Sequence, residues 1–550
     1  MSDTLTSKAV SLLQSLAVRG VEMRRLTTDS RTVTTGDIFL AYPGHYADGR
    51  AYIDDAVARG AAVVLFEPYA VSDMDGARLT ENVLTHARKA GVVCEPIENL
   101  VALAGELAHQ VCDRPSEKIW LAGVTGTNGK TSVSQWLLQA LTHMGQRCAV
   151  VGTLGNGFMG NLQETGYTTP DVLQLHTALS RFVHQGATAC VMEVSSIGLA
   201  EGRVQGVRFD VAIFTNLTRD HLDYHGTMDA YGEAKTQLFA NPWIRAAVLN
   251  LDDVFSPLLA QAVRPGVRVI GYTLNAANVV AAQAALLSAA PGVTAVDILV
   301  AGNLQMTTTG LAFEVNGQPF SVPVVGRFNA SNLMAVIAAL VAKGEPLDRI
   351  AIALKQLQPA PGRMQPVGGE AEPLVIVDYA HTPDALENIL AVSRELATVR
   401  GGQLVCVFGC GGNRDAGKRP VMGSIAERLA DRVIVTSDNP RDENPQQIIQ
   451  AILAGMLRPA SVIEQRGLAI TECIAQADAR DVIVLAGKGH EAYQEIAGVR
   501  EVFNDVDAAK SALVIRRQAG RDVKNSMSIQ QLPGIDQGDA FPAPSGRVRK

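Results

Sequence analysis

The stretch VTGTNGKTSV, residues 124–133, joins an apolar run to a helical pattern. The run from Ile119 to Val124 is typical of a buried strand, and the residues that follow the stretch have helical spacing. Glycines in such a turn let backbone N–H groups close around phosphate oxygens, and the helix N-terminus adds partial positive charge. Lys130 would neutralise terminal phosphates, and the Thr131 hydroxyl would bind Mg²⁺. The stretch therefore predicts a phosphate-binding loop.

The loop departs from the common pattern GxxxxGK[ST]. Val124 stands five positions before Gly129, and the first glycine lies one position earlier, at Gly123. A simple strand-to-helix turn is the alternative, but such a turn needs neither Lys130 nor Thr131. No NKxD motif follows, which weakens the interpretation as a GTPase. We therefore expect a variant phosphate loop.

The composition indicates a globular protein of several domains. The 550 residues are 47% hydrophobic, 19% charged and 5% aromatic, and chains of this length divide into domains. Forty-eight Lys and Arg against 55 Asp and Glu give a net charge of −7, so no basic field attracts nucleic acid or anionic lipid. We expect three domains and a small-molecule partner.

The cysteines and the N-terminus bear on location. The seven cysteines lack paired CxxC spacing, which favours reduced thiols over a zinc or redox site. The first residues lack the order of a signal peptide, and no apolar run reaches the about 18 residues that a membrane span needs. We expect a cytoplasmic protein with no membrane insertion.

Strand-like and helical runs alternate along the chain, which predicts an α/β fold. We expect a central P-loop-type domain with a doubly wound parallel sheet and a Rossmann-like C-terminal domain. In the C-terminal domain, four predicted strands are each followed by polar and glycine residues, which implies one shared site at the strand ends. The predicted units are an N-terminal domain at 1–98, a central domain at 99–358, a C-terminal domain at 359–516 and a disordered tail at 517–550.

The motif GTNGKT after a strand resembles the variant phosphate loop of the Mur ligases and their folate-adding relatives. The resemblance extends over most of the chain and is closest to members that add the third amino acid of the peptidoglycan stem. It implies three domains that bind a UDP-sugar, ATP and the incoming amino acid, with ATP and Mg²⁺ as cofactors. The implied nucleotide-binding residues are Thr125, Gly126, Thr127, Asn128, Gly129, Lys130, Thr131 and Asn329.

Carboxylate and imidazole groups at strand ends beside a phosphate loop suit Mg²⁺. Taken alone, Glu193, His221 and Lys235 are more often solvated, satisfied or surface residues. In Mur ligases the matching Glu and His bind magnesium, and the matching Lys is carbamylated. The resemblance therefore implies a metal site of Thr131, Glu193, His221 and carbamylated Lys235, and it implies Lys130, Lys235 and His221 as catalytic residues.

The resemblance also implies substrate contacts. The stretch SSIGLAEGR departs from a close relative at Ile197, where that relative has His, and at Glu201, where it has Gln, so no contact is assigned to Glu201. The implied UDP-binding residues are Thr28, Ser30, His45, Tyr46 and Ala47. The implied contacts to the UDP-N-acetylmuramoyl-dipeptide are Thr168, Thr169, Ser195 and Arg203.

The stretch SDNPRDENP bears on the amino acid that is added. Its DNPR motif, in the resembled family, marks meso-diaminopimelate addition. Diaminopimelate differs from lysine by a distal carboxylate, onto which Arg441 can fork while a protein carboxylate accepts the ammonium. The stretch DYAHTPDA, at 378–385, resembles a loop near the ATP, without an assigned role. The implied amino-acid contacts are Arg414, Asp438, Asn439, Pro440, Arg441, Gly487 and Glu491.

Together these features predict an ATP-dependent amide ligase of peptidoglycan precursor synthesis. It would add meso-diaminopimelate to the D-glutamate of UDP-N-acetylmuramoyl-L-Ala-D-Glu through an acyl phosphate. Three alternatives stay open. The ligase could add L-lysine instead, or the chain could be a folylpolyglutamate synthetase, which would lack the UDP-binding domain and the DNPR motif. An NTP-dependent binding module would have the loop without an acceptor site.

Overall fold

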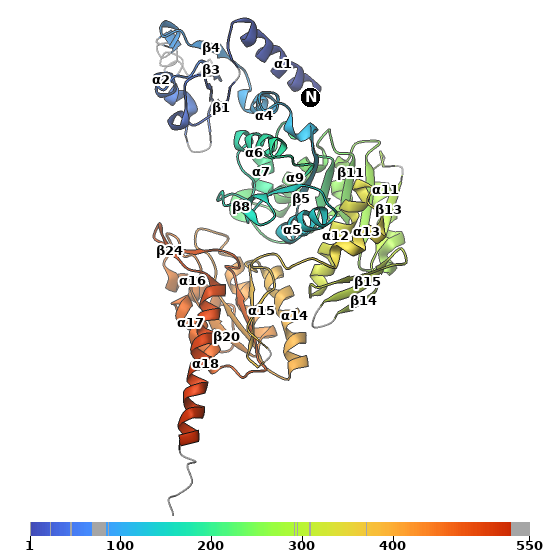
Figure 1. Cartoon of the computed structure of the whole chain (residues 1–550), viewed down its shortest axis with the longest axis vertical. Coiled ribbons are helices and arrows are strands. Elements are labelled where there is room, and N and C mark those ends of the chain that lie inside the picture. The colour runs from blue at the N-terminus through green and yellow to red at the C-terminus, as the bar shows by residue number, and fades with distance from the viewer. Residues whose placement is uncertain are drawn as a thin grey trace, which may run out of the picture.

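The computed structural model describes residues 2–22, 24–44, 47–68, 84–85, 87–290, 292–293, 295–306, 310–369 and 371–529. They form three α/β units that follow one another along the chain, with the central unit between the other two (Figure 1). This arrangement confirms the predicted α/β fold of three domains. Within the described residues, no helix combines the length and the apolarity that crossing a membrane requires.

The first unit is built on a small parallel sheet. Its elements are α1 (Ser2–Val18), β1 (Leu26–Thr27), β2 (Ile38–Ala41), α2 (Ile53–Ala58), β3 (Val63–Phe66), β4 (Val93–Pro96) and α4 (Leu100–Val111). The strands lie in the order β1-β2-β3-β4; α1 and α4 pack on one face, and α2 packs on the other. Because Leu103 and Leu107 of α4 belong to this core, packing extends the first unit beyond the predicted boundary at residue 98.

The central unit contains a nine-stranded sheet. Its strands are β5 (Trp120–Thr125), β6 (Cys148–Gly152), β7 (Gly155–Phe158), β8 (Asn161–Gln163), β9 (Ala189–Glu193), β10 (Val211–Phe214), β11 (Ala246–Asn250), β12 (Arg268–Thr273) and β13 (Val296–Val300). They lie in the order β13-β12-β11-β10-β5-β9-β6-β7-β8. All pairings from β13 to β6 are parallel, as predicted, whereas β7 and β8 add an antiparallel edge.

Helices cover both faces of the central sheet. They are α5 (Lys130–His143), α6 (Val172–His184), α7 (Ser196–Ala200), α8 (Leu222–His225), α9 (Met228–Phe239), α10 (Ser256–Ala262), α11 (Val279–Ala289), α12 (Arg327–Lys343) and α13 (Leu347–Leu354). A small antiparallel sheet of β14 (Gly302–Met306), β15 (Leu311–Val315) and β16 (Gln318–Val322) precedes α12. The helices α5, α12 and α13 share one core, and α6, α9 and α10 share the core on the opposite face.

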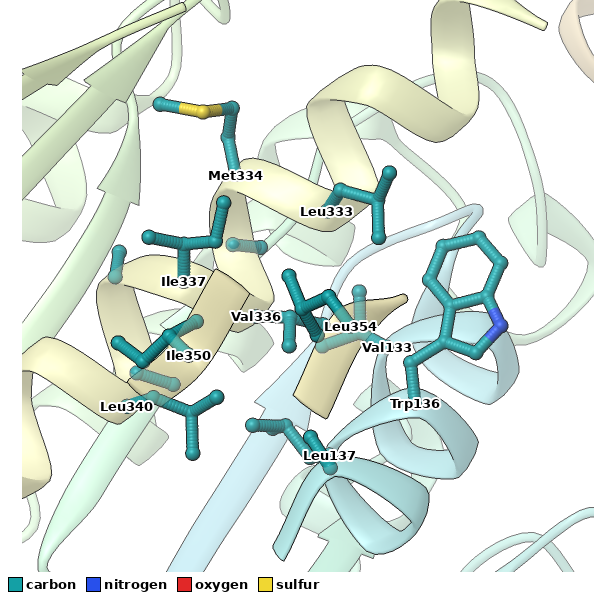
Figure 2. Close-up of a cluster of buried hydrophobic side chains, with 14 of the residues drawn as sticks. Val133, Trp136, Leu137, Leu333, Met334, Val336, Ile337, Leu340, Ile350 and Leu354 are labelled. Carbon is teal, nitrogen blue, oxygen red and sulfur yellow. The ribbon is translucent and has the colours of Figure 1, made fainter. Parts of the chain in front are cut away.

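The helix that begins at the phosphate loop is anchored in the first of these cores. Figure 2 shows Trp136 and Leu137 of α5 beside Leu333 and Ile337 of α12 and Leu354 of α13. The middle of α12 is apolar around its whole circumference, which is typical of a helix buried on all sides. The packing of α5 therefore sets where the phosphate loop can lie.

The third unit contains a six-stranded sheet in the order β17-β18-β22-β19-β20-β21. Its strands are β17 (Gln365–Val367), β18 (Leu374–Asp378), β19 (Leu404–Phe408), β20 (Arg432–Val435), β21 (Ser461–Val462) and β22 (Val482–Ala486), with a hairpin of β23 (Tyr493–Ile496) and β24 (Val499–Val502). Its helices are α14 (Pro383–Arg400), α15 (Lys418–Leu429), α16 (Pro445–Leu453), α17 (Arg466–Gln476) and α18 (Asp505–Ile529). The four predicted strands are all present and parallel.

The C-terminal helix α18 differs from the predicted tail. It continues to Ile529, so residues 517–529 are helical, and residues 530–550 of the expected tail lie outside the described residues. The extension, RQAGRDVKNSMSI, mixes good helix formers such as Arg, Gln, Ala and Lys with poorer ones such as Gly, Asn and Ser. The good helix formers prolong a helix whose first turns pack against α17 even where the apolar periodicity has ended.

A buried ion pair joins the first unit to the central unit. The Arg208 guanidinium donates to both carboxylate oxygens of Glu106 on α4, at 2.7 and 2.8 Å. The Trp243 ring lies 4.2 Å from the guanidinium carbon. Because a buried guanidinium requires a well-oriented partner, this bidentate pair holds α4 in one orientation against the central unit.

The core around α5 provides a test of how the phosphate loop is supported. Leu137 is fully buried, and we expect Leu137→Ala to lower the free energy of unfolding by about 3 kcal/mol, because lost burial and the new cavity add. Chemical denaturation followed by circular dichroism measures the change. Val280→Ala is the control, because Val280 is 79% exposed; equal effects of the two variants would contradict the assigned packing.

Candidate active site

The phosphate loop connects β5 to α5, as the sequence predicts. Gly129 precedes the first turn of α5 with a φ of 90°, and a Cβ atom there would lie 2.3 Å from Asn332 Oδ1. The Lys130 ammonium donates to the carbonyl oxygens of Gly126 and Thr127, at 2.8 and 2.9 Å. Burial lowers the pKa of Lys130. The cation is therefore held inside the loop, where a phosphate would bind.

Side chains from distant parts of the central unit determine the shape of the loop. Asn216 Oδ1 accepts a hydrogen bond from the Asn128 N–H at 2.9 Å, and Thr215 Oγ1 donates to the Asn128 carbonyl at 2.6 Å. The Tyr231 hydroxyl lies 3.0 Å from Thr127 Oγ1. These partners lie 87 to 104 residues further along the chain, so no local sequence pattern indicates them.

Glu193, at the end of β9, places a fully buried carboxylate beside the loop. Its Oε2 accepts hydrogen bonds from Thr131 Oγ1 at 2.9 Å and from Thr153 Oγ1 at 3.0 Å. Its Oε1 accepts one from the Thr153 N–H at 3.0 Å. The structure thus brings together Thr131 and Glu193, two of the predicted metal ligands.

His221 follows β10 in the left-handed conformation, with a φ of 53°. Its Nε2 lies 3.4 Å from Asp220 Oδ2. Although 36% of the side-chain surface is exposed, burial of the ring, opposed by the charge of Asp220 and supported by that of Lys130, lowers the pKa of His221 to about 4. At neutral pH the imidazole is therefore uncharged, which is the form that binds metal ions.

Lys235, on α9, is an unusual buried lysine. Its side chain is 1% exposed, and its ammonium lies 4.2 Å from the centre of the Tyr231 ring. In the part of the chain that the structure describes, no carboxylate forms an ion pair with it. Burial, and then the charge of Lys130, hold the pKa of Lys235 well below its usual value. A neutral amine in this position has the reactivity that carbamylation requires.

The predicted Mg²⁺ ligands are side chains of four different chemical types. Among the described residues, no group of three His, Cys, Asp and Glu side chains could hold a metal ion. The predicted set contains two side chains of these types, Glu193 and His221, together with a hydroxyl and Lys235. Because Mg²⁺ prefers oxygen ligands and keeps several waters, a carbamate on Lys235 would supply the second anionic oxygen donor that the set otherwise lacks.

A cavity of about 800 Å³ unites these groups. Part of its wall comes from the third unit, including Asp378 and His381. Thr125 is different: it is fully buried at the end of β5 and does not line the cavity. The predicted residues that line the cavity are Gly126, Thr127, Asn128, Gly129, Lys130, Thr131, Thr168, Glu193, Ser195, His221, Lys235 and Asn329.

Several residues of this cavity were not predicted as site residues. Arg363 Nη2 donates to Thr131 Oγ1 at 3.2 Å, and Asp384 Oδ2 accepts from Asn128 Nδ2 at 2.8 Å. Burial would raise the pKa of Asp220, but His381 and His221 hold it well below its usual range. His381 and Asp384 lie in the stretch DYAHTPDA, to which the sequence alone assigns no role, and Asp220 directly precedes the predicted metal ligand His221.

The predicted dipeptide-binding residues gather next to Glu193. Thr169 Oγ1 lies 3.0 Å from the Glu193 carbonyl and 3.2 Å from Ser195 Oγ, and Thr168 Oγ1 lies 3.0 Å from Thr153 Oγ1. Arg203 Nη1 donates to the Thr169 carbonyl at 2.9 Å. Arg203 Nε also donates to Glu201 Oε2 at 2.8 Å. Glu201 therefore orients Arg203.

The predicted UDP-binding residues are only partly described. Ser30 is buried at the start of a 3₁₀ turn, Ala47 is exposed, and His45 and Tyr46 lie outside the described residues. Thr28 lines a second cavity of about 430 Å³ between the first and central units, with Asn156 and Arg181 on the central side. Of the predicted UDP-binding residues that are described, the structure thus places Thr28 in a cavity between the first and central units.

The predicted amino-acid contacts meet at the strand ends of the third unit. Asn439 Nδ2 donates to Glu491 Oε2 at 2.8 Å. Gly487 has a φ of 116°, and a Cβ atom there would lie 2.5 Å from Asp438 Oδ2, so only glycine fits. Turns that follow β20 and β22 therefore contact each other, as expected for parallel strands that share one site.

Two arginines border this group. Arg441 has a φ of 51°, and its Nη1 donates to the Gly412 carbonyl at 2.8 Å. Arg414 is exposed, and its Nη1 donates to the Asn413 carbonyl at 3.0 Å. Among the described residues, neither arginine forms an ion pair with a carboxylate. Both are therefore free to bind an anionic ligand.

Three family models match the chain. The model described as "Mur ligase family, catalytic domain" matches residues 22–110, "Mur ligase middle domain" matches 124–340, and "Mur ligase, glutamate ligase domain" matches 362–489. These ranges follow the three structural units.

Similar proteins match over almost their whole length. The UDP-N-acetylmuramoyl-L-alanyl-D-glutamate--2,6-diaminopimelate ligase of Ectopseudomonas mendocina (strain ymp) is 49% identical over 499 residues, covering 90% of this chain and 96% of the relative. The ligase of the same name from Chromobacterium violaceum is 46% identical over 507 residues, covering 92% and 96%. A solved structure with this name has a TM-score of 0.61 and 36% identity, covering 90% of this chain and 95% of that one. The chain therefore belongs to the Mur ligase family.

Proposed function

We propose that the protein is an ATP-dependent amide ligase that joins meso-diaminopimelate to the D-glutamyl carboxylate of UDP-N-acetylmuramoyl-L-Ala-D-Glu. The similar proteins carry this reaction in their names. A contact between two units of the structure supports the proposal independently of these names. The third unit contacts the phosphate loop directly through Arg363 and Thr131. At its strand ends lies Arg441, which forms no ion pair within the described residues. The proposed site for an anionic amino acid and the predicted phosphate site thus lie on two units that contact each other. The reaction would take place in the cytoplasm, as a step in the synthesis of peptidoglycan precursors.

The first step would transfer the γ-phosphoryl group of ATP to the glutamyl carboxylate, giving an acyl phosphate and ADP. Lys130 and the loop N–H groups bind and orient the terminal phosphates. Thr168 and Ser195 line the cavity on the side where the acceptor would lie. Thr169 bonds to Ser195, and Arg203 donates to the Thr169 carbonyl. Little covalent chemistry falls to the protein in such a transfer, so positioning and charge neutralisation dominate.

Mg²⁺, held by Thr131, Glu193, His221 and the carbamate of Lys235, would neutralise triphosphate charge when bound. The neutral imidazole of His221 is the form that binds metal ions, and the Glu193 side chain already accepts a hydrogen bond from Thr131. Asp220 would help to orient His221, since its Oδ2 lies 3.4 Å from Nε2.

The second step would form the amide bond. A free amine of diaminopimelate attacks the acyl carbon and a tetrahedral intermediate forms. The nitrogen then loses a proton to solvent, and phosphate leaves with the electron pair of the broken C–O bond. Arg441 would bind the distal carboxylate of the amino acid, and Glu491 would accept its distal ammonium. Lysine would leave the Arg441 guanidinium without that partner, which disfavours it.

Phosphate release tests the proposed reaction directly. Purified protein with ATP, Mg²⁺ and UDP-N-acetylmuramoyl-L-Ala-D-Glu should release phosphate with meso-diaminopimelate and much less with L-lysine. Release with lysine would keep the ligase but remove Arg441 as the selector. Release with neither amino acid would contradict the proposed function, and a folate substrate would then be tried.

Arg441→Met tests the selectivity. We expect the KM for meso-diaminopimelate to rise about 100-fold, because a bidentate charged contact is lost, while the KM for ATP stays unchanged. Arg428→Met is the matched control, since Arg428 lies on the surface of the same unit in an ion pair with Glu387. A variant at Arg441 that still discriminates against lysine as strongly as the unmodified protein would disprove this role.

Lys235→Ala tests the proposed carbamate. Activity should fall at least about 100-fold, because an anionic ligand is lost, and acetate should restore part of it by filling the vacated space. In the unmodified protein, activity should depend on bicarbonate and should fall as pH is lowered, because only the neutral amine reacts with CO₂. Lys355→Ala, at an exposed position after α13, is the control. Full activity of Lys235→Ala without acetate would refute the carbamate.

A further inference from the structure

Lys488 is a fully buried lysine in the turn after β22. Its ammonium donates three hydrogen bonds: to Glu491 Oε2 at 3.0 Å, to Asn439 Oδ1 at 3.1 Å and to the Tyr493 carbonyl at 2.6 Å. An ammonium has three donors, so all of them are used within the protein. Lys488 therefore cannot bind a ligand itself and can act only through its partners.

The partners of Lys488 are also bonded to each other. Asn439 Nδ2 donates to Glu491 Oε2 at 2.8 Å, which closes a ring of three hydrogen bonds among Lys488, Asn439 and Glu491. Asn439 Oδ1 accepts a further hydrogen bond from the Glu495 N–H at 3.0 Å. The amide group of Asn439 is therefore held in one orientation, and the carboxylate of Glu491 is held at one of its two oxygens.

The other oxygen of Glu491 is free. Within the described residues, no donor bonds to Glu491 Oε1, whereas Oε2 accepts from both Lys488 and Asn439. The Glu491 side chain is 16% exposed, so one edge of it can be reached. A carboxylate that is fixed at one oxygen and open at the other is preorganised to accept an ammonium.

A buried ion pair fixes the end of β22, which closely precedes Lys488. Arg466 and Asp505 are both fully buried, and their side chains bond at 2.7 and 2.6 Å. Arg466 Nη2 also donates at 3.0 Å to the carbonyl of Ala486, the last residue of β22. The end of β22, before Gly487 and Lys488, is thus held by a buried ion pair between α17 and α18.

We propose that Lys488 is a positioning residue for the incoming amino acid, holding Asn439 and Glu491 as one rigid unit whose free Glu491 oxygen receives the distal ammonium. This inference rests on the proposed function, because it deepens the amino-acid site of that reaction. Lys488 determines how well diaminopimelate is bound and takes no part in phosphoryl transfer.

Lys488→Met tests the proposal, because methionine removes the charge and keeps an unbranched side chain. The KM for meso-diaminopimelate should rise at least about tenfold, since buried polar partners are left without their common donor. The kcat and the KM values for ATP and for the UDP-linked dipeptide should change less than about twofold. An unchanged KM for diaminopimelate, or an equal rise for all three substrates, would overturn the proposal.

Arg400→Met is the matched control. Arg400 Nη2 donates to the carbonyls of Glu372 and Ala479, both at 2.7 Å, at the opposite end of the same sheet. Its loss should lower the thermal midpoint of unfolding without a selective change in any KM. A selective rise in the KM for diaminopimelate in this control would show that general destabilisation produces the effect, and would remove the support for Lys488.

A double variant keeps the test decisive if Lys488→Met does not fold. Lys488→Met with Glu491→Met removes both charges together, which buried ion pairs often tolerate. If Lys488 acts through Glu491, the double variant should have a KM for diaminopimelate within about twofold of Glu491→Met alone. A further rise of tenfold or more would mean an independent role and overturn the proposal.

The unmodified protein separates this inference from the proposed function. If it releases no phosphate with meso-diaminopimelate, the proposed function fails. If it does release phosphate and Lys488→Met has an unchanged KM, only the role of Lys488 fails.

Discussion

The buried carboxylate of Glu193 is the constraint on which the site depends. It lies at the end of a central strand and accepts hydrogen bonds from Thr131, in the first turn of α5, and from Thr153. A buried charge of this kind is stable only when its surroundings provide fixed donors. The carboxylate therefore joins the phosphate loop to the neighbouring strand, and the residues predicted to bind the dipeptide are arranged around the same point.

The third unit is placed by contacts with this phosphate loop and with its helix. Trp136 Nε1 and Gln139 Nε2, both on α5, donate to the Gln358 carbonyl at 3.1 and 3.2 Å, where the connection to the third unit begins. Arg363 and Asp384 then reach Thr131 and Asn128. One helix thus carries the phosphate loop at its start and anchors the connecting segment, so the loop and the third unit share a common support.

Much of the fold could be predicted because parallel strands buried on both faces have a strong apolar signal. The strands around Ile119–Val124 and the four strands of the third unit all occur where expected. The antiparallel edge of β7 and β8 and the helical extension of α18 did not follow from that signal. Edge strands are short and partly polar, and the extension depends on propensity and on the packing of its earlier turns against α17.

The sequence by itself determined the Mur ligase family, and it predicted a phosphate loop and the types of residue at the site, because these depend on short motifs whose chemistry is local. Only the tertiary structure decided which groups act together. Among the residues that the structure describes, Lys235 has no carboxylate partner, no donor bonds to one oxygen of Glu491, and Lys488 is fully buried. None of this follows from spacing. Burial and pairing depend on residues that are distant in the chain, and desolvation changes the protonation and reactivity of each group accordingly.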